Sequence, residues 1–144
     1  MNLSRVLCVA LIVLLSSMAG CGGGNSFDPN KVTVTVSPSA VTIPASGQVT
    51  LHATVKGSPG NPGVVWFITE LQTNGSSGAQ CNWQGDTPPV GPCPDGTIQG
   101  AGAVSPTVTY LAPTTSGTFH VVAEYSLAFS TIVKDGTAVV TVSP

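Results

Sequence analysis

Charged and histidine side chains are scarce in this chain. Only 7% of its 144 residues are Asp, Glu, Lys or Arg, and two are His. The formal net charge is −2 at pH 7, and the few Lys and Arg residues are scattered, so no basic stripe exists to neutralise nucleic-acid phosphates. We therefore expect no nucleic-acid partner.

Long apolar runs and catalytic motifs are also missing. The longest apolar run, Val6–Leu15, is about half of the ~20 residues that a transmembrane helix needs. There is no Gly-x-Ser-x-Gly nucleophile elbow and no calcium loop of the Asp-x-Asp-x-Asp-Gly type. The sequence thus predicts no membrane-spanning helix, no enzyme activity, no metal site and no cofactor.

The first 20 residues have the pattern of a cleaved secretory signal peptide. Arg5 and the amino terminus are positive, Val6–Leu15 is apolar, and small residues follow. Met18-Ala19-Gly20-Cys21 resembles the lipobox of bacterial lipoproteins, with Met18 where Leu is usual. The resemblance implies cleavage before Cys21 and a diacylglycerol on its sulfur. Ordinary secretion, with a cysteine present there by chance, is the alternative.

A lipid on Cys21 would hold the protein to a membrane of the bacterial cell envelope. We expect the outer membrane or the cell surface, not the inner membrane. Residues 21–30 follow as a flexible tether, because three glycines come directly after Cys21. Its reach is at most ~33 Å at ~3.3 Å per extended residue.

The cysteine count agrees with export. Cys8 leaves with the signal peptide and Cys21 is modified, so Cys81 and Cys93 remain as one pair. In an oxidising compartment such a pair forms a disulfide. Its ring of about 13 residues would contribute roughly 3 kcal/mol in the chain-entropy model. A zinc site is the alternative, but it needs four ligands and no His is a neighbour of these two Cys.

From Lys31 onward apolar residues recur with a period of two, which is typical of half-buried strands. Val32, Val34 and Val36, for example, alternate with Thr33 and Thr35, and segments rich in Gly and Pro separate the runs. The runs indicate about seven short strands and essentially no helix.

Four segments carry a family resemblance: residues 34–55, Trp66, Tyr110 to Ala123 and 138–144. They resemble bacterial immunoglobulin-like (Big-type) domains, in which Tyr-x-Ala-Pro is followed by Gly-Thr-Phe or Gly-Thr-Tyr. The resemblance implies an all-β fold, an immunoglobulin-like antiparallel sandwich of about seven strands in one domain at 31–144. The strands that it implies are 31–43, 48–56, 63–69, 107–111, 118–126 and 137–143. A disulfide-containing insert at about 70–106 interrupts the pattern. Some related domains carry a similar Cys pair just before a Gly-Thr-Ile segment.

This fold assigns roles to the remaining candidate residues. His52 and His120 fall at outward positions in opposite sheets, and Glu124 lies ~13 Å along the strand from His120. We interpret both histidines as solvated surface residues without a catalytic or metal partner. Trp66 is expected in the core. Trp83 lies in a Gly- and Pro-rich loop, where it either caps the base of the sandwich or serves as a recognition side chain.

The sequence therefore predicts a non-catalytic cell-envelope lipoprotein that binds a protein or a polysaccharide. The alternative is a structural or accessory subunit packed permanently against a larger envelope complex. Related domains usually occur in tandem as spacers, and this chain has one copy, so we expect the domain itself to be the working part. The chain should enter the sandwich at the pole of the loops 57–63 and 127–136, which places residues 72–95 at the opposite, outward pole.

Overall fold

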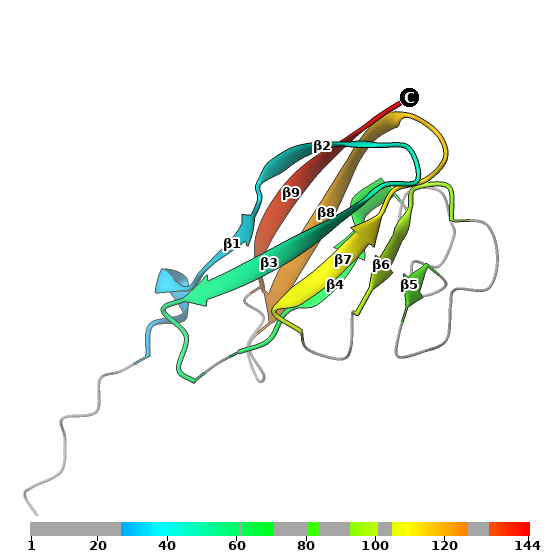
Figure 1. Cartoon of the computed structure of the whole chain (residues 1–144). Helices are drawn as coiled ribbons and strands as arrows, with labels where there is room; N and C mark the ends of the chain where they lie inside the picture. The colour runs from blue at the N-terminus through cyan, green and yellow to red at the C-terminus, as the bar shows by residue number, and fades with distance from the viewer. Residues whose placement is uncertain (1–26, 61, 71–80, 84–92, 101–104, 127–132) are drawn as a thin grey trace, which may run out of the picture.

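The chain folds into two β-sheets that pack face to face (Figure 1). The computed structural model describes residues 27–60, 62–70, 81–83, 93–100, 105–126 and 133–144. Within these ranges, alternating Val and Thr side chains put one apolar row on the inner face of each strand. Two such faces bury each other, which is why the chain forms a sandwich.

The first sheet has the order β1 (Thr33–Ser37), β3 (Gln48–Lys56), β7 (Thr107–Leu111), β6 (Thr97–Gln99), β5 (Asn82–Trp83). The second has the order β2 (Ala40–Pro44), β9 (Val133–Ser143), β8 (Gly117–Ser126), β4 (Val65–Ile68), and the 3₁₀ turn η2 (Pro29–Lys31) precedes β1.

This strand order is that of an immunoglobulin-like sandwich. β1, β3, β7 and β6 correspond to strands A, B, E and D of one sheet, and β4, β8 and β9 correspond to C, F and G of the other. The expected fold class is thereby confirmed. Two of the described pairings, β2 with β9 and β5 with β6, are parallel instead of antiparallel.

Two short strands, β5 and β6, are not expected from the sequence. Residues 97–99, counted within the insert, form β6 and pair with β7. Of its three residues only Ile98 is buried, so the segment is too short to show an alternating pattern. The pairing with β7 was decided by tertiary contacts.

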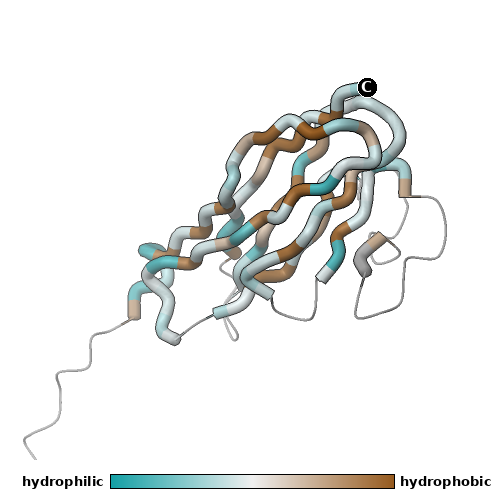
Figure 2. Tube along the Cα trace, viewed as in Figure 1, coloured by the Kyte–Doolittle hydropathy of each residue, from teal (hydrophilic) through white to brown (hydrophobic). Residues whose placement is uncertain are grey.

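The core lies between the two sheets, as the alternation of apolar and polar residues along the strands predicts (Figure 2). Trp66, Tyr110 and Leu51 are its largest fully buried side chains. The Nε1–H of Trp66 donates a hydrogen bond to the carbonyl of Ser105 at 2.7 Å, so the indole has a polar partner. The expectation that Trp66 belongs to the core is confirmed.

The sandwich has two ends, which the registers define. At the proximal end β1 begins beside the end of β3 (Thr33 opposite Lys56), and β9 begins beside the end of β8 (Val133 opposite Ser126). At the distal end β3 begins beside the end of β7, and β9 ends near the C-terminus (Figure 1). Because β1 starts at the proximal end, the chain reaches the domain there, as expected.

The signal peptide, Cys21, the tether up to residue 26 and most of the insert lie outside the described residues. Their assignments therefore stay predictions. Among the described helical residues, no segment is long and apolar enough to cross a bilayer.

Candidate binding edge at the disulfide

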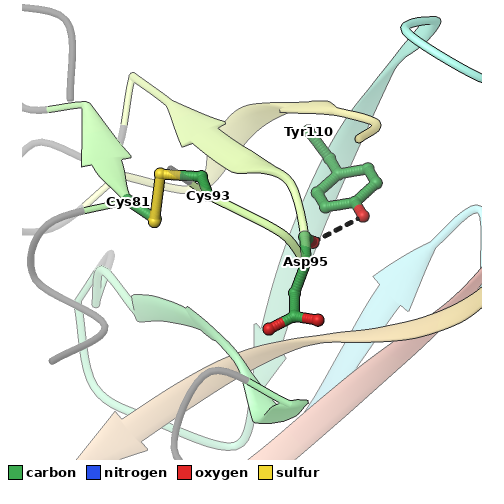
Figure 3. The surroundings of a disulfide bond; sticks show 4 residues. All are labelled: Cys81, Cys93, Asp95 and Tyr110. Atoms are coloured by element: carbon green, nitrogen blue, oxygen red, sulfur yellow. Dashed lines mark hydrogen bonds between the residues drawn. A yellow bond between two sulfur atoms is a disulfide. The ribbon is translucent and has the colours of Figure 1, made fainter. Parts of the chain in front are cut away.

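Cys81 and Cys93 are joined by a disulfide at the β5 edge of the five-stranded sheet (Figure 3). Their Cα atoms lie 5.7 Å apart, inside the usual range for a bridge. Cys81 is buried, and its carbonyl accepts a hydrogen bond from the N–H of Ile98 at 3.1 Å. The predicted disulfide is confirmed, and it ties the insert to strand β6.

A tight turn follows the bridge. The N–H of Gly96 donates to the carbonyl of Cys93 at 3.1 Å, which closes Cys93-Pro94-Asp95-Gly96 as a β-turn. Gly96 has a φ of +90°, and a Cβ there would lie 2.6 Å from the carbonyl oxygen of Leu111 and from the hydroxyl of Tyr110. Only glycine fits, because the turn is pressed against β7.

Tyr110 holds this turn in place. Its hydroxyl donates to the carbonyl of Asp95 at 2.8 Å, and Figure 3 shows the ring of Tyr110 beside the turn. Burial, and then the negative charges of Glu70 and Asp95, raise the pKa of Tyr110, so the donor stays protonated. The side chain of Asp95 is buried and points away from the disulfide (Figure 3); its Oδ2 has no hydrogen-bond partner within the described part of the chain.

Glu70 holds the start of the insert. Its Oε1 and Oε2 accept hydrogen bonds from the backbone N–H of His120 at 3.2 and 3.0 Å, and Oε1 lies 2.6 Å from Nδ1 of the His120 ring. β4 ends at Ile68, so the carboxylate takes the place that the next residue of a longer strand would have beside β8. Burial alone would raise the pKa of Glu70, but these hydrogen bonds lower it below 4.5.

The His120 side chain is 44% exposed, as expected of a surface residue, but it pairs with Glu70, 50 residues away in sequence, which the sequence did not lead us to expect. Sequence analysis tested only Glu124, which lies on the same strand. One sequence signal pointed to Glu70 as a partner of His120. Glu70 directly follows the strand that contains Trp66, and that strand lies next to β8 in any immunoglobulin-like strand order.

Trp83 lies in strand β5 and not in a loop, which corrects the sequence interpretation. Its backbone pairs in parallel with Gln99 of β6, at the outer edge of the sheet. Both flanking segments, 71–80 and 84–92, and the Trp83 side chain itself lie outside the described part of the structure. The two alternatives for this side chain, a cap or a recognition residue, therefore both stay open.

His52 is exposed, as expected, and lies in the other sheet from His120. Its Nδ1 is 2.7 Å from Oγ1 of Thr107, and it lines a groove of about 280 Å³ together with Gly60, Pro62 and Pro106. That volume is just below the range of typical small-molecule pockets. Across the described ranges, no group of three His, Cys, Asp or Glu side chains could hold a metal ion.

Two parts of the insert are held to the sandwich. Glu70 holds its start to β8, and the disulfide, the turn and Tyr110 hold residues 93–96 to β6 and β7. The polar pairs at this edge therefore act as structural contacts between the insert and the two sheets.

Comparisons with known proteins give a distant structural likeness and no family. No protein-family model and no curated protein matches the chain. Among solved structures, it is similar to domain 1 of VCBP3 from Branchiostoma floridae, with 17% identity, a TM-score of 0.40, and coverage of 78% of this chain and 95% of that chain. At these values the likeness carries no argument about the fold or the function of this chain. The chain has an immunoglobulin-like fold, as its own strand order establishes.

Proposed function

We propose that this chain is a non-catalytic bacterial cell-envelope lipoprotein, anchored through Cys21, that binds a protein or a polysaccharide with its disulfide-bridged insert. An immunoglobulin-like fold is suited to a binding or a structural role, and the fold itself is established. The lipid anchor rests on the sequence Met18-Ala19-Gly20-Cys21.

The observation that carries the proposal is the placement of the insert relative to the tether. The chain reaches the sandwich at its proximal end, where β1 begins. Two described parts of the insert, Glu70 and the turn at 93–96, lie toward the distal end, because Glu70 contacts β8 beyond β4 and the turn at Gly96 lies against Leu111. A protein held by its N-terminus would therefore present the insert away from the membrane.

The first experiment tests the anchor. Expressed in a bacterial host, Cys21→Ser should remain uncleaved by the lipoprotein peptidase and carry no thioether lipid. Mass spectrometry of the N-terminal peptide of the wild-type protein should show a diacylglycerol on Cys21. A wild-type peptide without this mass would overturn the anchoring part of the proposal.

The second experiment tests Trp83 as the anchor residue of the interface. Partners are isolated from gently solubilised membranes with the lipidated protein as bait, and their affinity is then measured. Removal of a central interface aromatic typically costs at least ~2 kcal/mol, which is roughly thirtyfold in Kd. We expect Trp83→Ala to weaken binding by about this factor and to leave thermal unfolding nearly unchanged.

Val65→Ala is the matched control, because Val65 is exposed but lies at the proximal end. It should change neither binding nor unfolding. If Trp83→Ala lowers the melting temperature and spares binding, Trp83 is a packing residue and the insert hypothesis fails. If the partner instead cannot be separated without unfolding the domain, the alternative of a permanent structural subunit is favoured.

A further inference from the structure

A groove opens beside the end of β3, where this strand runs past the start of β7 (Figure 1). Its volume is about 280 Å³, and the described residues that line it come from β3, from the loop after β3 and from the position just before β7. They include His52, Val55, Gly60, Pro62 and Pro106. No Asp, Glu, Lys or Arg is among these described residues, so the groove suits an uncharged ligand.

A proline ends the pairing of β3 with β7 at this groove. The N–H of Ala53 donates to the carbonyl of Pro106 at 2.7 Å. The return bond of an antiparallel pair is missing, because Pro106 has no N–H. The chain before it turns toward the other sheet, where the carbonyl of Ser105 accepts the hydrogen bond from Nε1 of the buried Trp66. β7 therefore does not continue beside the last residues of β3.

The backbone of Val55 is the unpaired part of this edge. Successive residues of a strand direct their N–H and carbonyl groups to opposite sides, so Val55, two residues after Ala53, directs both of its groups toward the β7 side. Thr54 and Lys56 direct theirs toward β1 instead. Among the described residues, neither group of Val55 has a backbone partner on the β7 side. Val55 thus presents one donor and one acceptor to the groove.

This pair of backbone groups fits one more strand. A residue of an extended peptide placed opposite Val55 would exchange both hydrogen bonds with it, as a hydrogen-bonded pair of an antiparallel ladder does. Such a strand would lie about 4.8 Å from β3, in the groove that Gly60 and Pro62 line from the other side. A sugar hydroxyl could satisfy one of the two groups, but a peptide carries an N–H and a carbonyl at the spacing that the ladder requires.

The remaining lining residues give the groove a defined shape. The ring of His52 is held by Thr107, whose Oγ1 lies 2.7 Å from Nδ1. Pro62 and Pro106 add apolar rings and no backbone donor. A Cβ at Gly60 would meet nothing within 4 Å, so this residue leaves space in the groove. The main chain of a bound peptide would therefore pair with β3 on one side only.

We infer that this groove binds an extended, uncharged peptide segment of a partner protein, which adds a strand antiparallel to β3 beside Val55. The recognition is by main-chain hydrogen bonds, and the proline rings contact the side chains of the peptide. This is a second binding surface of the domain. It requires neither the lipid on Cys21 nor the side chain of Trp83.

Amide exchange of Val55 is the direct test. The processed protein, as purified from the expressing cells, is isotope-labelled and mixed with pools of capped five-residue peptides without charged side chains, at millimolar concentration. Ala53 supplies the matched control, because its N–H lies on the same side of the same strand and is already bonded to Pro106. Without peptide, the Val55 amide should exchange faster than that of Ala53. With peptide, exchange at Val55 should slow at least about tenfold and exchange at Ala53 should stay unchanged.

The most strongly bound peptide is then methylated on one backbone nitrogen at a time. Methylation of the nitrogen that faces Val55 should weaken binding about fivefold, because one main-chain hydrogen bond is lost. Methylation of the next nitrogen, which faces away from β3, should change Kd less than about twofold.

Three results would overturn the inference. The first is a Val55 amide that exchanges as slowly as that of Ala53 without peptide, because the edge would then already be paired. The second is equal weakening by methylation at every position. The third is that no peptide pool protects Val55, whether or not a neutral oligosaccharide such as cellohexaose does. Each of them leaves the tests of the Cys21 anchor and of Trp83 unaffected.

Discussion

The body of the sandwich and its disulfide-bridged edge are stabilised in different ways. β8 and β9 pair along the whole length of β8, and both contribute inner-face residues to one continuous core. β5, in contrast, pairs with β6 at two positions only. The edge depends on single fastenings: one disulfide, one turn, one tyrosine hydroxyl and one carboxylate. The stability of the body is shared among many buried side chains, whereas the edge depends on the identity of a few particular residues.

The largest effect is expected in the body. Trp66 is fully buried and also donates a hydrogen bond to Ser105. Trp66→Ala should lower the free energy of unfolding by about 3–5 kcal/mol, measured by urea denaturation. The neighbouring exposed Val65→Ala should change it by less than about 0.5 kcal/mol. Similar losses for the two variants would contradict the assignment of the core.

Removal of the disulfide should have the next largest effect. The bridge spans a sequence separation of 12, and the double variant Cys81→Ala/Cys93→Ala should lose about 3 kcal/mol in the same measurement. Added reductant should then destabilise the wild type and leave the double variant unchanged. An unchanged unfolding curve for the double variant would show that the bridge does not hold the edge in solution.

Two glycines offer a matched comparison at the edge. Gly96 and Gly100 both have positive φ, +90° and +80°, but a Cβ at Gly96 meets backbone and Tyr110 atoms while a Cβ at Gly100 meets nothing within 4 Å. Gly100→Ala should cost about 1 kcal/mol, from the backbone conformation alone. Gly96→Ala should cost at least about 2 kcal/mol. Equal melting temperatures for the two variants would argue against the close contact of the turn with β7.

The smallest effect concerns the pair of Glu70 and His120. The folded pKa of Glu70 is lower than 4.5, so its contribution to stability is present above that pH and is lost as pH falls through the folded pKa. Because the pair is partly exposed, Glu70→Gln should cost less than about 1 kcal/mol at pH 7. The difference between wild type and variant should shrink as pH falls through the lowered folded pKa of Glu70. A difference that does not shrink in acid would mean that charge is not what Glu70 contributes.

Much of the body could be predicted from the sequence. The expected strand 48–56 coincides with β3, because alternation of apolar and polar residues with Gly or Pro at the boundaries is a local signal. The strand 107–111, which the family resemblance implies, coincides with β7. The edge could be predicted less well. The disulfide followed from counting cysteines, but β5 and β6 are too short to carry a periodic pattern.

The sequence by itself determined an all-β sandwich, the pairing of Cys81 with Cys93 and the buried position of Trp66, because each depends on a local pattern or a count. Only the tertiary structure decided the partner of His120, the need for glycine at position 96 and the unpaired backbone of Val55 beside Pro106. These features join residues far apart in sequence. They follow from the register of neighbouring strands, and a one-residue shift in register would have changed them.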